Sequence, residues 1–359
     1  MESKPSVQKL PSIQPKVLMQ DLQNKYGHKQ MIKLNSNENP YGYSLNVIES
    51  IKNIDHLHFY PEVNDPLLFQ KLANLLGVQV QQIIFGNGSD ELIQMVCRAF
   101  LQPGDESILA KETFPGFLTE IQIEGALPIQ VPLKNGVHDL NQMKQMISHK
   151  TKIIWLCNPN NPTGTIFTHQ SLVDFLNQLP KNILVVIDEA YAEYVLDTNY
   201  PKSLALLSNY PQLIVIRTFS KIYGLAGIRL GYGIAHPKLI HELHKVRPPC
   251  NINRIAQQAA IAALADQKFV DYCRNTNEQQ RRRLYDHLNK WNLPYYVSHG
   301  NFIMFDMKYP SKKVYQFLLE HGIIVRYFPN YPTHIRMTIG TPKQNQVFIN
   351  IFSRFLESH

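Results

Sequence analysis

The feature that most constrains the fold is an alternation of short apolar runs with helical segments between residues 83 and 236. The apolar runs cover residues 83–85, 107–110, 128–133, 153–157, 183–188, 213–217 and 230–235. Helical segments lie between them, among them residues 117–124, 140–147, 171–179 and 204–209. This alternation predicts an α/β fold, because a strand that joins a parallel neighbour needs a crossover connection, usually a helix. Continuous apolar runs further predict a mainly parallel sheet that helices cover on both faces.

The pattern changes after Pro237. The sequence predicts helices at 252–265, 266–288 and 312–320, a strand-like run at 295–307, strands at 323–327 and 335–339, and a last helix from residue 343. This mixture indicates a smaller α+β domain, with which we expect the N-terminal segment to pack. We therefore predict a large domain over residues 36–250 and a small domain formed by residues 1–35 and 251–359. Two domains suit a chain of 359 residues, because single cores stop growing near about 250–300 residues.

The composition argues against several classes of protein. No apolar run approaches the roughly 20 residues that a membrane-spanning helix needs, so we expect no membrane association. The N-terminus lacks the pattern of a signal peptide. The four cysteines are scattered, without the spacing of a metal site or the density of a disulfide scaffold. These observations favour a cytoplasmic protein with no bound metal.

The positive charge leaves a nucleic-acid-binding protein open as an alternative. The net charge is +8 and the sequence pI is near 9.1. The best local support is a run of three arginines at 281–283. That run lies in a polar, helical stretch, and charge runs on helices usually face water. We therefore predict a solvated helix face here and no nucleic-acid partner.

Three of the predicted strands end in segments that could contact a ligand. The segments are residues 86–92 (GNGSDEL), 158–164 (NPNNPTG) and 188–191 (DEAY). Open α/β sheets bind ligands at the carboxyl ends of their strands, so we expect these segments to lie together. A glycine-rich turn before a helix also exposes N–H groups to a phosphate. Taken alone, each segment has an ordinary explanation as a helix cap or a loop.

A segment around Lys221 indicates which ligand these strand ends would bind. Residues 217–229 read RTFSKIYGLAGIR, in which Lys221 follows hydroxyl-bearing residues and precedes an arginine. This segment resembles a pyridoxal phosphate (PLP) attachment site, where the lysine binds the cofactor covalently. The residues expected to hold the phosphate are Ser89, Asp90 (through its backbone), Thr218, Ser220 and Arg229.

Asp188, Asn161 and Tyr191 match the needs of the PLP ring. The ring is an electron sink only while its nitrogen is protonated, so a carboxylate must lie against that nitrogen. Asp188 suits this role, because a nearby opposite charge favours both ionised forms. Asn161 and Tyr191 would bind the phenolic oxygen of the ring. In the predicted reaction, Lys221 moves a proton between the substrate carbon and the cofactor.

Further segments identify a family resemblance over nearly the whole chain. They are residues 32–42 (IKLNSNENPYG), 60–62 (YPE), 86–91 (GNGSDE) and 335–340 (IRMTIG). Together with the lysine segment, they resemble fold-type I PLP-dependent aminotransferases, and within these the histidinol-phosphate aminotransferases. The resemblance implies transamination between L-histidinol phosphate and 2-oxoglutarate, which yields imidazole acetol phosphate and L-glutamate. It also implies a homodimer in which Tyr60 reaches the PLP phosphate of the neighbouring subunit.

The resemblance assigns roles to four more residues. Phe114 would stack on the cofactor ring, where a flat side chain supplies contact area and excludes water. Arg336 and Arg326 would bind substrate anions, because a guanidinium forks onto a carboxylate or a phosphate. A structural salt bridge is the alternative for each arginine. Asn39 would also contact the substrate.

Two alternatives share the predicted fold and cofactor. An aromatic amino-acid aminotransferase would use the same site without a substrate phosphate, and a threonine-phosphate decarboxylase would remove carbon dioxide instead of a proton. One departure from the family pattern bears on this choice. Relatives commonly carry Pro-Tyr near the N-terminus, where this chain has Pro11-Ser12-Ile13. Ile13 cannot replace the tyrosine hydroxyl at the substrate phosphate.

Overall fold

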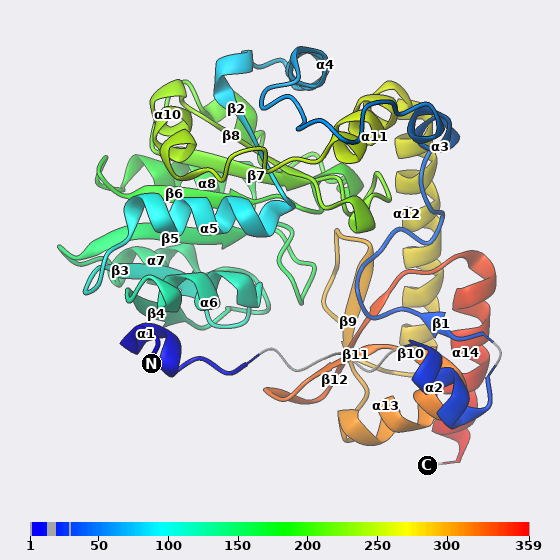
Figure 1. Ribbon diagram of the computed structural model, residues 1–359. Coiled ribbons are helices and arrows are strands. Elements are labelled where there is room, and N and C mark those ends of the chain that lie inside the picture. The colour runs from blue at the N-terminus through cyan, green and yellow to red at the C-terminus, as the bar shows by residue number, and fades with distance from the viewer. Residues whose placement is uncertain (1, 13–18, 29, 359) are drawn as a thin grey trace.

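A seven-stranded sheet forms the centre of the molecule in the computed structural model, which describes residues 2–12, 19–28 and 30–358 (Figure 1). Its strand order is β2-β8-β7-β6-β5-β3-β4. The strands are β2 (Ile83–Gly86), β3 (Glu106–Ala110), β4 (Leu127–Val131), β5 (Thr151–Cys157), β6 (Leu184–Asp188), β7 (Leu213–Thr218) and β8 (Gly231–Ala235). Neighbouring strands are parallel except that β8 runs antiparallel to β2 and β7. The predicted α/β fold with a mainly parallel sheet is confirmed.

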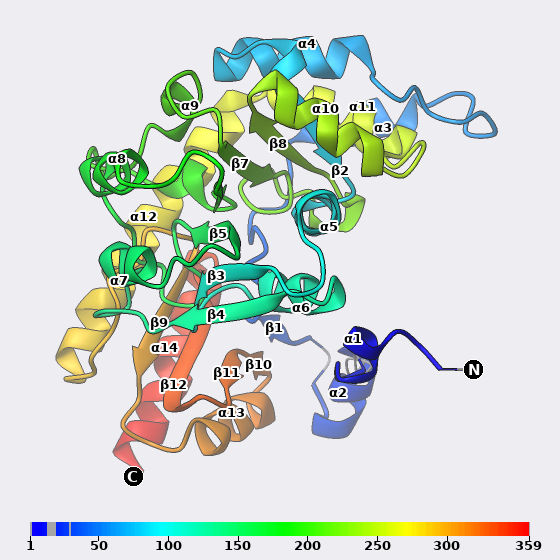
Figure 2. The ribbon, with the colours of Figure 1, turned by 90° about the vertical axis from the view of Figure 1, so that its left-hand side faces the viewer.

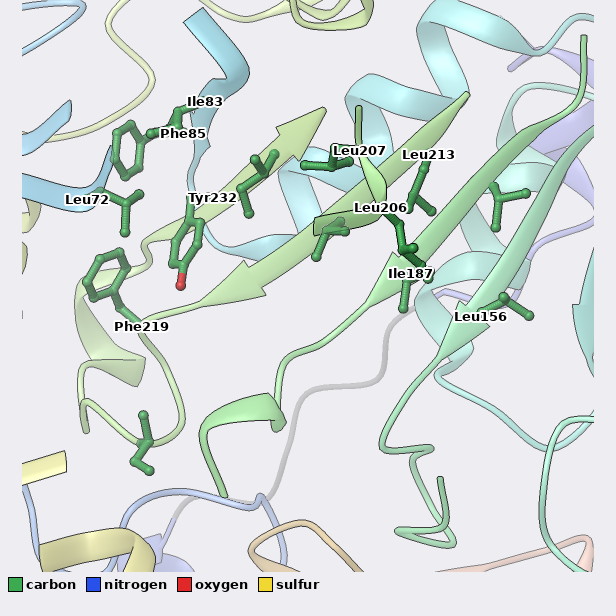
Figure 3. Close-up of a cluster of buried hydrophobic side chains, with 14 of the residues drawn as sticks. Leu72, Ile83, Phe85, Leu156, Ile187, Leu206, Leu207, Leu213, Phe219 and Tyr232 are labelled. Atoms are coloured by element: carbon green, nitrogen blue, oxygen red, sulfur yellow. The ribbon is translucent and has the colours of Figure 1, made fainter. Parts of the chain in front are cut away.

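Helices cover both faces of this sheet. One face packs on α5 (Ser89–Phe100), α6 (Pro115–Ile123) and α10 (Pro237–Val246). The other packs on α4 (Pro66–Leu76), α7 (Leu140–Gln145), α8 (His169–Asn177) and α11 (Arg254–Ala265). Strand β5 has apolar side chains on both faces of the sheet. Trp155 packs in the apolar cluster with α5, α6 and α10, whereas Ile154 and Leu156 pack in the second cluster, with α4, α7, α8 and α11. Figure 3 shows part of the second cluster, where the ring of Tyr232 packs against Phe219 at 5.4 Å between centroids.

A second, smaller sheet carries the C-terminal part of the chain. Its antiparallel order is β11-β12-β9, from β11 (Arg326–Phe328), β12 (Tyr331–Thr338) and β9 (Phe302–Asp306). A separate parallel pair joins β1 (Ile32–Lys33) to β10 (Ile323–Ile324). Helices α13 (Ser311–Glu320) and α14 (Pro342–Glu357) pack with these strands in one apolar cluster. The single strand expected at 323–327 is therefore wrong, because Val325 separates two short strands that pair with different partners.

Helix α12 (Gln267–Lys290) joins the two parts of the molecule, as Figure 1 shows. Its first half contributes Val270 and Cys273 to the core of the large sheet, and its second half contributes Leu284 and Leu288 to the smaller core. The expected solvated face of this helix is wrong for Arg281, which is buried and donates to the carbonyl of Gly300 at 3.2 Å.

The N-terminal region touches both parts of the chain. Helix α1 (Pro5–Gln8) lies against α6, and Ser6 Oγ donates to the Ile123 carbonyl at 2.9 Å. Helix α2 (Met19–Tyr26) approaches α13. The remaining helices are α3 (Leu45–Lys52), α9 (Ser203–Leu206) and the short 3₁₀ turns η1 (Val80–Gln82), η2 (Ala192–Tyr194) and η3 (Ala226–Ile228).

The division into two domains stays a prediction. The expectation for Ile13 at the substrate phosphate concerns a residue outside the described ranges. In the described ranges, no helix is long and apolar enough to cross a bilayer.

Candidate active site

The site lies where several strands of the large sheet end. Asp188 is the last residue of β6, and the turns after β5 and β7 carry Asn161 and Lys221. Helix α5 begins at Ser89, three residues after β2 ends. The expectation that the strand-end segments gather at one edge follows from the parallel order β7-β6-β5, since parallel strands end on the same side.

Asp188 is a buried carboxyl group beside the amine of Lys221. Its Oδ1 accepts a hydrogen bond from the Ala190 N–H at 3.0 Å. Burial is the main reason that its pKa is raised to about 7, while Asp90 raises it further and Lys221 lowers it. A positively charged group bound next to this carboxyl group would lower its pKa and so stabilise the ionised form.

Lys221 has an amine that is readily deprotonated. Burial, and then the positive charge of Arg336, lower its pKa to about 8. Its Nζ donates to the Ser36 carbonyl at 3.3 Å and lies 5.6 Å from the centre of the Tyr191 ring. A partly buried lysine with a lowered pKa suits both covalent attachment of a carbonyl compound and proton transfer.

The hydroxyl of Tyr191 is the centre of a polar cluster. It accepts from Asn37 Nδ2 at 3.0 Å and from Asn161 Nδ2 at 3.4 Å, so its own proton stays available to a ligand. The Asn161 oxygen accepts from the guanidinium of Arg336. Burial raises the pKa of Tyr191, so the phenol keeps its proton at neutral pH. Two predicted ring ligands and a predicted substrate ligand therefore lie in one hydrogen-bonded chain.

The start of α5 lies close to Arg229, and the turn after β7 leads to Lys221. Gly88 has a φ of 81°, and a Cβ there would lie 2.5 Å from Arg229 Nη2. The glycine therefore leaves room for the guanidinium to lie over the N-terminus of the helix. Arg229 pairs with the half-exposed Asp90 carboxylate at 3.0 Å. Thr218 Oγ1 accepts the Ser220 N–H at 3.0 Å, which shapes the turn that leads to Lys221.

Arg336 enters the site from the smaller sheet. It is 7% exposed, and its Nη2 donates to the Asn35 carbonyl at 2.8 Å. Its guanidinium lies over the rings of Phe302 and Phe328, at 5.4 and 5.7 Å from the centroids. Burial is the main reason that its pKa is lowered to about 10. In the described ranges, its Nε has no hydrogen-bond partner, which leaves a buried donor for a bound anion.

For four predicted site residues, the contacts in the structure do not test the predicted role. Phe114 packs edge-on against Phe117, with ring centroids 5.6 Å apart. Asn39 donates to the carbonyl of Ile222, the residue after Lys221. Arg326 is exposed on β11, and Tyr60 is 86% exposed in the loop between α3 and α4 that projects in Figure 2. Their roles toward cofactor or substrate stay predictions.

Comparison with known proteins places this geometry in a family. Residues 29–352 match the sequence profile of the family described as aminotransferase class I and II. The chain belongs to the class I and II aminotransferases. It is 44% identical to a histidinol-phosphate aminotransferase of Geobacillus sp. (strain WCH70) and 45% identical to one of Brevibacillus brevis, with 99% of each chain covered. The crystal structure of the histidinol-phosphate aminotransferase of Sinorhizobium meliloti in complex with PLP has a TM-score of 0.91 at 27% identity, and covers 99% of this chain and 98% of that one.

The aminotransferase is PLP-dependent, and its residues fit the cofactor. The glycine at position 88 keeps open the approach of Arg229 to the helix N-terminus, where a phosphate would bind. In the predicted arrangement, Asp188 would meet the ring nitrogen, and Asn161 and Tyr191 would meet the phenolic oxygen. When bound, PLP supplies an electron sink for charge that develops at the substrate carbon. As the sequence predicts, Lys221 would bind the cofactor and would move the proton at that carbon.

Sequence reasoning missed two residues of the aminotransferase site. Asn37 is 1% exposed, has a φ of 54°, and bonds both Tyr191 and Thr338. Phe302 packs against Tyr191 at 5.0 Å and against Arg336. The segment that contains Asn37 carried part of the family resemblance, so a signal for it existed. Phe302 reads as an ordinary core residue, and nothing local distinguishes it.

Proposed function

We propose that this aminotransferase transfers the amino group of L-histidinol phosphate to 2-oxoglutarate, which yields imidazole acetol phosphate and L-glutamate. The observation that carries the proposal is a pair of arginines on neighbouring strands. Arg326 of β11 lies directly opposite Arg336 of β12 in the antiparallel register. Over the ranges 2–12, 19–28 and 30–358, neither forms an ion pair with a carboxylate.

Like charges directly opposite each other destabilise a sheet. The ring of Phe328 partly offsets this cost, because it lies 5.8 Å from the Arg326 guanidinium and 5.7 Å from that of Arg336. An anion bound by both arginines would remove the remaining repulsion. Histidinol phosphate carries such an anion away from its reacting nitrogen, as a phosphate, and glutamate carries one as a side-chain carboxylate. The relatives named above support the same substrate.

The two alternatives have less support. An aromatic amino acid carries its one anion, the carboxylate, on the reacting carbon itself, and has none farther away for the arginine pair. The solved L-threonine-O-3-phosphate decarboxylase of Porphyromonas gingivalis is 21% identical to this chain, so the likeness shows the fold alone.

Single-turnover kinetics of each half-reaction, followed by cofactor absorbance, test the substrate. Loss of a buried charge-assisted pair costs about 2–5 kcal/mol, so Arg336→Ala should lower kcat/KM of both half-reactions by a factor on the order of 10² or more. Arg326→Ala should affect the phosphate substrate more than glutamate. The control is Arg354→Ala, at an exposed position on α14. If Arg336→Ala leaves both half-reactions intact, or if phenylalanine and tyrosine outperform histidinol phosphate, the substrate proposal fails.

We also propose a cytoplasmic homodimer in which Tyr60 completes the phosphate site of the second copy. The loop between α3 and α4 exposes Leu57, Phe59 and Tyr60, and an apolar loop of this kind favours a partner surface. Mixing inactive Lys221→Ala with inactive Tyr60→Ala should restore one intact site per mixed dimer, with activity near half that of the wild-type dimer. The two variants alone are the controls. A fully active monomer by light scattering would refute shared sites.

A further inference from the structure

Glu189 and Arg217 form a buried ion pair behind the catalytic edge of the large sheet. Arg217 donates from Nε and Nη2 to the same oxygen, Glu189 Oε2, at 2.9 and 2.8 Å. The Glu189 side chain is fully buried, and that of Arg217 is 16% exposed. None of the site contacts described above uses this pair.

The pair joins the two strands that carry the catalytic residues. Glu189 follows Asp188 at the end of β6, and Arg217 lies in β7, four residues before Lys221. Side chains alternate between the two faces of a strand, so Glu189 points away from the face that Asp188 presents. The pair therefore lies on the reverse side of the site.

Few other contacts hold these strand ends together. The last pair in the β6–β7 ladder is Asp188 with Ile216, and one more backbone bond joins the Glu189 N–H to the Ile216 carbonyl at 2.8 Å. Beyond that point the two segments diverge. The segment after β6 enters η2, and the segment after β7 forms the turn that leads to Lys221. Among the described residues, the Glu189–Arg217 bonds are thus the last hydrogen bonds between these two strands before the site.

Stability alone does not explain a pair of this kind. Burial of two charges carries a desolvation cost that can exceed their attraction, and an apolar pair often serves a fold equally well. In the described part of the chain, Glu189 Oε1 has no hydrogen-bond partner, so the carboxylate is not fully compensated. Both arginine hydrogen bonds end on one oxygen. Two bonds restrict the position of the Arg217 guanidinium relative to the Glu189 carboxylate more closely than one bond would.

We propose that Glu189 and Arg217 are positioning residues, which hold the Asp188 carboxylate and the Lys221 amine at the separation that bound PLP requires. The inference rests on the PLP-dependent reaction and is independent of which amino donor the enzyme uses. A displacement of the order of 1 Å at a catalytic group is enough to lower turnover by about 10².

Glu189→Gln tests the pair with little change in shape. PLP binding to the apoenzyme is measured by fluorescence titration, kcat and KM by the glutamate half-reaction, and stability by thermal unfolding. We expect the Kd for PLP to rise about tenfold or more, the scale on which a metal site loses affinity when a supporting contact is removed. We expect kcat to fall by about 10², with KM for glutamate within about threefold of wild type. Glu278→Gln is the matched control, because it breaks a partly buried arginine pair on α12 away from the site.

A double variant, Glu189→Leu with Arg217→Met, separates position from stability. We expect it to melt within a few degrees of the wild-type enzyme, yet to bind PLP and turn over as poorly as Glu189→Gln. Wild-type PLP affinity and kcat in the folded double variant would overturn the proposal. If the double variant does not fold, Arg217→Lys decides, because it keeps the charge and loses the fork. An Arg217→Lys enzyme with unchanged PLP affinity and kcat would also overturn the proposal. The PLP measurement involves no donor, so its outcome does not depend on the substrate assignment.

Discussion

Replacement of Asp188 by asparagine should make the PLP-free enzyme more stable at neutral and alkaline pH. Burial is the main reason that the pKa of this carboxyl group is about 7 instead of 3.8. Between these values the folded protein holds a proton that the unfolded chain has released. The stability that Asp188 contributes is therefore fully present below about pH 4, and it is lost as the pH rises through about 7.

The size of the effect follows from the two pKa values. Each pKa unit corresponds to about 1.4 kcal/mol, so the whole difference is about 4 kcal/mol. About 2.5 kcal/mol of this falls between pH 5 and pH 8. Asparagine has nearly the same shape and does not titrate, so the variant should gain about that much on the wild-type protein over this interval. It should also bind PLP more weakly, because the ring nitrogen loses its charged partner.

Urea unfolding of both PLP-free proteins, at several pH values between 5 and 8, measures the change. The control is Asp286→Asn, which removes an exposed carboxylate on α12. Its free energy of unfolding is measured at the same pH values as that of Asp188→Asn. The reasoning is refuted if the difference between Asp188→Asn and wild type is also constant, within about 0.5 kcal/mol, over the same interval.

Two further predictions concern neighbouring groups. Lys221→Ala should abolish the covalent PLP adduct that borohydride reduction traps and mass spectrometry detects, and an adduct that persists on another lysine would contradict the assignment. Asn160→Ala should lower the free energy of unfolding by about 2–4 kcal/mol, because buried partners lose their hydrogen bonds. Its carboxamide is within 3.1 Å of the side chains of Thr113, His138 and Thr163. A loss below about 1 kcal/mol in urea unfolding would show that these partners find other bonds.

The large sheet and its chemistry could be predicted because they depend on local patterns. The apolar runs of β5 and β6 are continuous, and the topology of a parallel sheet then places their carboxyl ends at one edge. The residues that follow, Asn161 and Asp188, needed no knowledge of distant parts of the chain.

Contacts between distant segments could not be predicted in this way. Asn37 reaches Tyr191 across 154 residues of sequence, through a backbone with positive φ. The break at Val325 arises because β10 pairs with β1 whereas β11 pairs with β12. An apolar run in the sequence does not indicate which strand it will pair with. Arg281 was misjudged for a similar reason, since its buried carbonyl partner lies in a loop that only the folded chain brings near.

The residues predicted to bind the cofactor and those proposed to bind the substrate side chain lie on different sheets of this enzyme. Asp188 is the last residue of β6, and Lys221 follows β7, so both depend on strands with buried side chains in the large sheet. Arg326 and Phe328 lie on β11, an edge strand of three residues at the margin of the smaller sheet. If Arg326 contributes to donor recognition as we propose, substitutions at this margin would change the choice of amino donor without touching the strands that lead to Asp188 and Lys221.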